Sequence, residues 1–237
     1  MSKILALDSS TDACSVALHI DGQTTHLFEL AAKSHTQRLL PMVDEILAEA
    51  KCALADLDAI AYGRGPGSFT GLRICMGVVQ GLAFGSGLPV LPISTLEAMA
   101  CGYMQQHPDN DLPLLPALDA RMEEIYWGFF SAGQRPQALL PEQVMKPALV
   151  AEHSQVASLQ KQFIALGSGW HYPELEVIAP AVVFQEACPT AKDIVTLAVA
   201  AYAEHAQISI LDAQPVYLRD SVSWQKRQRI REAPISH

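Results

Sequence analysis

The glycine-rich segment 63–73, Gly-Arg-Gly-Pro-Gly-Ser-Phe-Thr-Gly-Leu-Arg, constrains the fold more than any other part of the chain. It follows an apolar run at 57–62, which predicts a strand, and leads into a helix predicted at 69–84. Three further glycines recur at every fourth position and line one face of that helix: Gly77, Gly81 and Gly85. Each costs about 1 kcal/mol relative to alanine in a helix interior. We therefore expect another element to approach this face closely.

Composition limits the classes to which the chain can belong. It has 237 residues, half of them apolar, which is enough for one or two domains with real cores. No apolar run reaches the roughly 18 residues of a membrane-spanning helix, and the first residues lack a signal-peptide pattern. We therefore expect a cytoplasmic protein with no membrane partner. The five cysteines form no C-x-x-C pair and are expected to be reduced.

The charge is distributed unevenly along the chain. The net charge is −9, yet residues 224–237 hold four basic residues and one acidic residue, which leaves −12 on the rest. A body so acidic repels a phosphate backbone, which argues against nucleic-acid binding by this chain alone, with the basic tail as the one exception. The basic residues of this tail are Lys226, Arg227, Arg229 and Arg231. A solvated terminus is the simplest interpretation of the segment.

The first half has a recognisable order of elements. Apolar alternation predicts strands at 3–8, 14–20 and 24–30, with Asp21-Gly22 as a hairpin turn. A helix that begins at Ser34 or Thr36 and ends near 51 follows, and Pro41 is expected to end, kink or restart it. Strands at 57–62 and 88–91 then alternate with helices at 69–84 and 95–106. Three strands followed by alternating helices and strands are typical of a mixed sheet of ribonuclease-H-like order.

The second half repeats this order more loosely after a polar break at 107–111. We predict a smaller lobe at 107–220 and a basic tail at 221–237, behind a first lobe at 1–106. The elements expected in the second lobe are strands at 112–118, 125–130, 163–166 and 214–218, and helices at 148–162 and 190–206.

One candidate binding site combines the first strand end with the glycine-rich loop. Carboxylate and hydroxyl groups there, with a helix start that offers free N–H groups, could hold phosphate or a hydrated metal. The loop is neither a P-loop nor a dinucleotide fingerprint, because no Gly-Lys-Ser/Thr follows and Ser68 replaces the third glycine. Ordinary turn chemistry remains the alternative. The candidate residues are Asp8, Ser10, Gly65, Gly67, Ser68, Thr70 and Arg73.

Two other polar groups were considered as sites. His35 has no second ligand one helical turn later, since Leu39 occupies that position, so we interpret it as a surface histidine at a capped helix start. The charged run 119–124 is interpreted as a hairpin turn with a local ion pair. No two histidines have a helical metal-pair spacing, and no nucleophile, base and orienting group can be assembled from spacing. We therefore expect no metal site and no catalytic residues.

The chain resembles the TsaB (YeaZ) family over nearly its whole length. The glycine-rich segment is the most specific part of the resemblance. The matching stretches are 5–11, 14–18, 34–41, 63–73, 92–96, 117–122 and 215–219. The resemblance implies an α/β, actin-like ATPase (ASKHA) fold of two ribonuclease-H-like lobes, with mixed sheets flanked by helices. It also implies a role in forming N6-threonylcarbamoyladenosine at position 37 of tRNA.

The resemblance implies that the chain is a non-catalytic scaffold, which binds and activates a TsaD-like transferase through its first lobe. A TsaE-like ATPase joins the two proteins in that family. The resemblance implies a homodimer when the partner is absent, contact with tRNA only through the complex, no required cofactor, and at most weak ATP or ADP binding. The transferase carries a metal-binding H-x-x-x-H pair, whose second histidine is Leu39 here. The implied partner-binding residues are His35, Leu39, Leu40, Val43, Ile46, Leu47, Gly77, Gly81 and Gly85.

Two alternatives stay open at this stage. The chain could act alone as an ASKHA-type ATPase or phosphotransferase, although it lacks the Asp-x-Gly-Thr phosphate hairpin usual in that fold. It could also be a glycoprotease-like peptidase, although it lacks metal ligands and a marked serine site. The glycine row likewise has two interpretations, docking of a second molecule or packing on the chain's own sheet.

Overall fold

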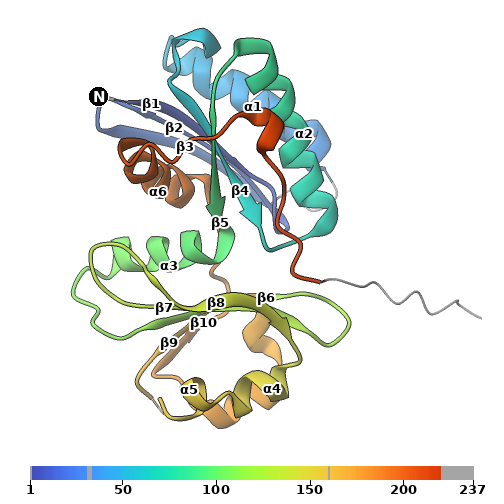
Figure 1. Ribbon diagram of the computed structural model, residues 1–237, viewed down its shortest axis with the longest axis vertical. Coiled ribbons are helices and arrows are strands. Elements are labelled where there is room, and N and C mark those ends of the chain that lie inside the picture. The colour runs from blue at the N-terminus through green and yellow to red at the C-terminus, as the bar shows by residue number, and fades with distance from the viewer. Residues whose placement is uncertain (1, 31–33, 160, 220–237) are drawn as a thin grey trace, which may run out of the picture.

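The computed structural model describes residues 2–30, 34–159 and 161–219, and it has two lobes stacked along the long axis (Figure 1). Each lobe is built on a five-stranded mixed sheet. The first sheet has the order β3-β2-β1-β4-β5 and consists of β1 (Lys3–Asp8), β2 (Ala13–Ile20), β3 (Gln23–Leu30), β4 (Ala59–Gly65) and β5 (Val90–Ser94). The predicted turn at Asp21-Gly22 is confirmed, because both residues have positive φ and join two antiparallel strands.

Helices cover both faces of the first sheet, which explains why β1 is apolar at successive positions. Leu5 and Leu7 pack against α1 and α2, whereas Ile4 and Ala6 face α6. Burial on both faces is typical of central strands in such sheets. The longer helices are α1 (His35–Glu49), α2 (Phe69–Ser86), α3 (Thr95–Gln106) and α6 (Ala191–Ala203).

The second sheet repeats the topology of the first. Its order is β10-β9-β6-β7-β8, which matches the first sheet when the strands of each are counted along the chain. Its strands are β6 (Leu114–Asp119), β7 (Ile125–Phe130), β8 (Ala138–Met145), β9 (Ile164–Leu166) and β10 (Val182–Phe184). The short α4 (Pro147–Glu152) and α5 (Ser154–Ala157) cover it, with 3₁₀ turns η2 (Ser168–His171) and η3 (Pro173–Ile178). The looser duplication of element order that the sequence indicated is therefore present.

The structure differs from the sequence-based assignment at several elements. The helix expected at 148–162 is two short helices separated by His153, and β8 and β10 were not predicted. Residues 214–218 form no strand, and Val216 there makes a backbone hydrogen bond to Arg64 instead (N···O 2.7 Å). Pro41 lies on the exposed side of α1, which continues through it to Glu49. The tail at 221–237 lies outside the described residues.

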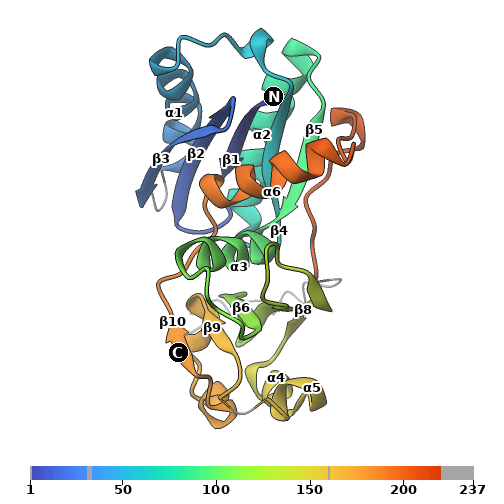
Figure 2. The same cartoon turned by 90° about the vertical axis from the view of Figure 1, so that its left-hand side faces the viewer.

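The domain assignment also needs a correction, because α6 does not belong to the second lobe. It follows the second sheet in sequence but returns to the first sheet and packs on β1, β2, β4 and β5 (Figure 2). Thr190 caps this helix, with its hydroxyl accepting from the Asp193 amide. A further 3₁₀ turn, η4 (Ile210–Asp212), and the extended segment 213–219 then follow the first lobe toward the second.

The lobes are joined by packing and by polar contacts. Helix α3 packs its apolar side on the second sheet, through residues such as Leu96 and Met99. At the start of α3, Arg64 of β4 forms an ion pair with Glu142 of β8 (3.1 Å), and the hydroxyl of Ser94, which caps α3, donates to the same carboxylate. Within the described residues, no helix is both long and apolar enough to cross a membrane.

Candidate docking face and interlobe cleft

The glycine-rich loop is filled by the chain's own first turn. The Ser68 amide donates to the Ser10 carbonyl oxygen (2.7 Å), and the Ser9 hydroxyl donates to the Gly71 carbonyl oxygen (2.9 Å). A Cβ at Gly67 would meet the Ser10 backbone, and one at Gly71 would overlap the Ser9 backbone. Close approach of two backbones, 62 residues apart in sequence at Ser9 and Gly71, therefore explains these two glycines.

Asp8 is sealed beneath this loop. Its side chain is completely buried, and its Oδ2 accepts from the Ser10 amide (3.2 Å) and hydroxyl (2.9 Å). Its Oδ1 has no hydrogen-bond partner and lies against Gly63, where a Cβ would overlap it. Burial raises the pKa of Asp8 to about 7, although the two hydrogen bonds from Ser10 oppose this shift. A carboxyl group in this position is inaccessible to a ligand.

Other members of the predicted phosphate site are held by the protein in the same way. Ser68 caps α2, since its hydroxyl accepts from the Gly71 amide (3.3 Å). Gly65 has φ +103° and is enclosed by Leu72 and the Val216 carbonyl oxygen. Of the seven candidate residues, those with exposed side chains are Ser68, Thr70 and Arg73.

A cleft of about 630 Å³ lies between the lobes. Thr11, Ser68 and Thr70 line it on the first lobe, and Asp119 and Ser168 are among its second-lobe residues. Among the described residues, no group of three or more histidine, cysteine or acidic side chains could hold a metal ion. The described side chains that line the cleft thus include both hydroxyl and charged groups.

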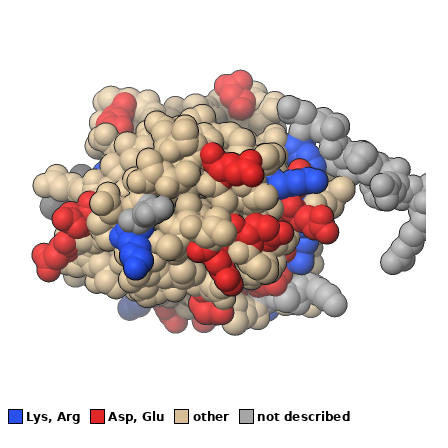
Figure 3. Space-filling model, turned by 90° about the horizontal axis from the view of Figure 1, so that it is seen from below, with Lys and Arg blue, Asp and Glu red and all other residues tan. Residues whose placement is uncertain are grey.

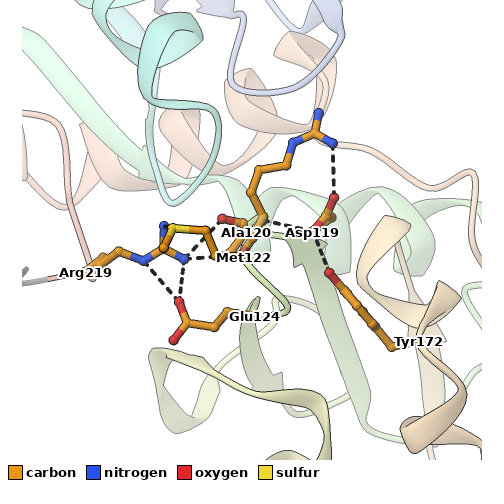
Figure 4. A network of polar contacts seen from close by, with 7 residues as sticks. Asp119, Ala120, Met122, Glu124, Tyr172 and Arg219 are labelled. Atoms are coloured by element: carbon orange, nitrogen blue, oxygen red, sulfur yellow. Dashed lines mark hydrogen bonds and ion pairs between the residues drawn. The ribbon is translucent and has the colours of Figure 1, made fainter. Parts of the chain in front are cut away.

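The β6–β7 turn in this cleft is strained and braced. Arg121, Met122 and Glu123 all have φ near +60°, a region that costs non-glycine residues about 1–2 kcal/mol each. Arg219 braces the turn by donating to the Ala120 (3.2 Å) and Arg121 (3.4 Å) carbonyl oxygens and by pairing with Glu124 (Figure 4). Asp119 pairs with Arg121 (3.4 Å) and accepts from the Tyr172 hydroxyl (3.1 Å). The predicted hairpin turn with a local ion pair is confirmed.

The outer face of α2 is open and nearly free of charge. Apart from the local helix backbone, no atom of the described residues lies within 4 Å of a Cβ built at Gly77, Gly81 or Gly85. Phe84, on the same face, is 77% exposed. Arg73 is the one charged residue in the whole of α2. We call this the α2 face; its exposed residues are Phe69, Thr70, Arg73, Gly77, Gln80, Gly81, Phe84 and Gly85.

Helix α1 contributes less to this exposed surface than its sequence suggests. Leu39, Val43 and Ile46 are buried against the first sheet, so in this chain they face inward. Leu40 is 44% exposed, and Leu47 is half-buried. Of the partner-binding residues predicted on α1, Leu40 is therefore the exposed one.

His35 is also placed differently from the prediction. We expected a surface histidine, but His35 is only 9% exposed, and its Nε2 lies 2.9 Å from the Thr11 carbonyl oxygen. This contact fixes the start of α1 on the turn that follows β1. The side chain thus has a structural contact within the first lobe.

The α2 face also contains aromatic residues that the sequence reasoning missed. Phe69 and Phe84 are exposed on it, and Tyr217 of the C-terminal segment lies beside Phe69, with ring centroids 5.4 Å apart. The spacing of Phe69, Arg73 and Gly77 by four residues was a usable signal, because such positions share one helix face. Tyr217 also contacts Arg73, which lies 144 positions earlier in the chain, so local sequence could not indicate its place beside α2.

Comparisons with known proteins agree with this architecture. Residues 27–227 match the family model of TsaD, described as tRNA N6-adenosine threonylcarbamoyltransferase. The protein named tRNA threonylcarbamoyladenosine biosynthesis protein TsaB from Escherichia coli strain K12 is 41% identical, covering 94% of this chain and 97% of that protein. The Haemophilus influenzae protein of the same name is 40% identical, covering 94% and 96%. The solved structure of YeaZ from Pseudomonas aeruginosa has 42% identity and a TM-score of 0.85, and it covers 92% of this chain and 100% of that chain.

These matches define the class of protein to which the chain belongs. The chain belongs to the TsaD domain family, and the predicted actin-like ATPase (ASKHA) fold of two ribonuclease-H-like lobes is confirmed. Within that class, it is a member of the TsaB (YeaZ) family.

Proposed function

We propose that this chain is a non-catalytic accessory subunit of the machinery that makes N6-threonylcarbamoyladenosine at position 37 of tRNA. Its relatives from two organisms are named as biosynthesis proteins for this modification. In this proposal the chain binds a TsaD-type transferase and activates it. It takes part through a docking surface and requires no cofactor of its own.

The observation that carries the proposal is the openness of the α2 face. A helix with three exposed glycines on one side is less stable than one with alanines, by about 1 kcal/mol per residue. Nothing in the described part of this chain packs on those positions. A glycine row without covering side chains allows the backbone of another helix to come close. An exposed, nearly uncharged helix face of this kind is typical of an interaction site.

The nature of the partner follows from the family. Because the chain itself matches the family model of the transferase, a TsaD-type chain is expected to have an equivalent pair of helices. Two related helix pairs can pack about a pseudo-twofold axis, and the same surface can support a homodimer when the partner is absent. A TsaE-like ATPase joins this assembly in our proposal.

Charge supports a role in which other subunits carry the tRNA. The chain has a net charge of −9, and acidic side chains are spread over the face of the molecule shown in Figure 3. Such a surface repels the phosphate backbone of RNA. We therefore propose that tRNA meets this chain only through the complex.

The two enzyme alternatives have less support from the site. An ATPase of this fold needs acidic and hydroxyl groups that reach the phosphates, whereas Asp8 is fully buried and the glycine-rich loop is filled by Ser9 and Ser10. One solved relative from Pseudomonas aeruginosa is described as similar to the peptidase YeaZ. Among the described residues that line this cleft, no serine hydroxyl or cysteine thiol is hydrogen-bonded to a histidine side chain: Ser10 donates to Asp8, and His171 contacts the Ser168 backbone carbonyl oxygen.

Co-purification with a TsaD-type partner tests the proposal. We expect the two chains to form a stable complex, and the transfer of the threonylcarbamoyl group to tRNA to fall when this chain is omitted. Gly81→Arg should prevent the complex, because the added side chain projects from the α2 face into the partner. Gln155→Arg, which adds the same charge at an exposed position of α5 in the second lobe, is the control.

Two results would contradict the proposal. One is normal complex formation by Gly81→Arg, since docking on the α2 face could not then be the basis of function. The other is tight binding of ATP with magnesium, with turnover, by the purified chain in isothermal titration and phosphate-release assays. That second result would favour an ATPase.

A further inference from the structure

Arg73 is held in a fixed position on the α2 face. Its guanidinium carbon lies 3.7 Å from the centroid of the Phe69 ring and 5.9 Å from that of Tyr217. Its Nε donates to the Tyr217 hydroxyl (3.2 Å). A guanidinium packed over one aromatic ring and hydrogen-bonded to a second aromatic residue keeps its charge and loses rotamer freedom before any partner arrives.

The C-terminal segment keeps Tyr217 in place from both sides. The Val216 amide donates to the Arg64 carbonyl oxygen (2.7 Å), and three residues later Arg219 is bound to the β6–β7 turn. Tyr217 therefore lies on a short piece of chain fixed to both lobes. The position of Arg73 thus depends on the segment 216–219 as well as on α2.

The charge of Arg73 has no acidic counterpart in the described part of the chain. The described ion pairs use the other arginines Arg38, Arg64, Arg121, Arg135 and Arg219. No described carboxylate lies within 4.0 Å of the Arg73 nitrogens. Its Nη1 and Nη2 groups remain available to an incoming acceptor, which suits bidentate contact with a carboxylate.

The direction of Arg73 separates it from the interlobe cleft. Ser68, Phe69 and Thr70 line that cleft, but Arg73 does not. It lies one helical turn from Gly77, on the same side of α2 as the open glycine positions. A role for Arg73 in holding phosphate within the cleft is therefore less consistent with the structure than a role on the α2 face.

We propose that Arg73, fixed by Phe69 and Tyr217, is the charged anchor of the α2 face and pairs with a carboxylate on the helix pair of the TsaD-type partner. The inference rests on the proposed function and deepens it by naming the chemistry that the partner must present. Arginine and tyrosine are among the residues that most often dominate binding energy at interfaces. On a face otherwise without charge, one ion pair also sets the register of the docked helices.

Affinity measurements on the purified pair, as a function of salt, test this inference. We expect Arg73→Gln to weaken binding of the TsaD-type chain tenfold or more, and Arg73→Glu to weaken it further through repulsion. The dissociation constant of the wild-type pair should rise with salt more steeply than that of Arg73→Gln. Lys146→Glu, which makes the same charge change at an exposed position of the second lobe, should alter affinity less than twofold.

A conservative variant guards against a folding defect. Arg73→Lys keeps the charge but cannot form the bidentate contact, so we expect an affinity between those of the wild type and Arg73→Gln. Thermal unfolding of each variant shows whether it is folded at the temperature of the assay. If Arg73→Gln binds within twofold of the wild type while Gly81→Arg does not bind, the anchor is wrong and the docking face stands. If Gly81→Arg also binds normally, the proposed function itself is wrong.

Discussion

Gly71 lies directly against the backbone of Ser9, with no space for a Cβ between them. Six residues further along the same helix, a Cβ at Gly77 would meet no atom of the described residues within 4 Å, apart from the local helix backbone. The glycines of α2 therefore serve two different purposes. Gly71 faces inward and admits the turn that follows β1, whereas Gly77 faces outward and leaves the α2 face open.

Alanine substitutions at these two positions should have opposite effects on stability. Gly71→Ala forces a methyl group into the Ser9 backbone, so we expect a loss of about 2–4 kcal/mol in the free energy of unfolding, the range of severe core strain. Gly77→Ala should gain about 0.5–1 kcal/mol, because alanine favours the helix and the site is open. Urea unfolding followed by circular dichroism measures both. A loss of stability in Gly77→Ala would mean that its methyl group meets an element of the protein.

Local sequence pattern predicted much of the first lobe. Alternation and the Asp21-Gly22 turn correctly predicted the first three strands. The helix predicted at 95–106 is α3, and Ser94 caps it by accepting from the Glu97 amide (3.1 Å). The second lobe was harder because its elements are short. Strand β8 contains Pro141 and polar residues at the edge of its sheet, so its periodicity is weak.

Long-range packing explains the remaining errors. Nothing in the sequence of α6 indicates that it returns to the first sheet, since its apolar residues would suit either lobe. The predicted phosphate site is occupied by the chain itself for a similar reason. Asp8 and the glycine-rich loop were brought together as expected, but Ser9 and Ser10 occupy the space between them. Local composition could not distinguish a loop that receives a ligand from one that receives its own chain.

The buried carboxyl group of Asp8 should make stability depend on pH. Its pKa is about 7 in the folded protein and about 3.8 when unfolded, so the folded state binds the extra proton between these values. The free energy of unfolding should therefore fall as pH rises from about 4 to about 7 and then level off. The contribution amounts to a few kcal/mol, at about 1.4 kcal/mol per pKa unit.

Asp8→Asn isolates this contribution. The amide keeps an oxygen for the two Ser10 donors but cannot ionise, so we expect the variant to be more stable than the wild type at pH 8. The difference should vanish near pH 4. Burial also raises the pKa of Asp193, to about 6, with the same sign, but Asp193 is present in both proteins and cancels in the comparison. Parallel stability curves for the two proteins across this range would show that Asp8 is already ionised when folded.

The exposed Phe84 allows association to be tested apart from folding. It is 77% exposed on the α2 face, so Phe84→Ser should change the free energy of unfolding of the monomer by less than about 0.5 kcal/mol. We expect the same change to weaken both the homodimer and the complex with the TsaD-type chain, as measured by sedimentation velocity. Val177→Ser, at a site 75% exposed in the second lobe, should leave association unchanged. Equal sedimentation of all three proteins would remove Phe84 from the interface.

Two arginines of the interlobe cleft should contribute very differently to stability. Arg219 is mostly buried and binds two carbonyl oxygens and the Glu124 carboxylate, which together hold the strained turn at 121–123. Arg121 pairs with Asp119, but its side chain is 82% exposed. We expect Arg219→Gln to cost about 1–3 kcal/mol, because hydrogen bonds to charged groups are lost and the turn loses its brace. Arg121→Gln should cost less than about 0.5 kcal/mol, as for other exposed ion pairs.

Hydrogen exchange distinguishes bracing of the turn from a general effect of losing an arginine. The Ala120 amide donates to the Glu124 carbonyl oxygen (2.9 Å), and the Glu124 amide donates to the Arg121 carbonyl oxygen (3.2 Å). Exchange of these two amides therefore reports on whether the turn is closed. In Arg219→Gln these two amides should exchange faster than in the wild type. The amides of β1 should exchange at the same rate in both proteins when the two are compared under conditions of equal free energy of unfolding. The backbone conformation is strained and needs outside support. Unchanged protection at Ala120 and Glu124 would therefore mean that the turn keeps its shape without Arg219.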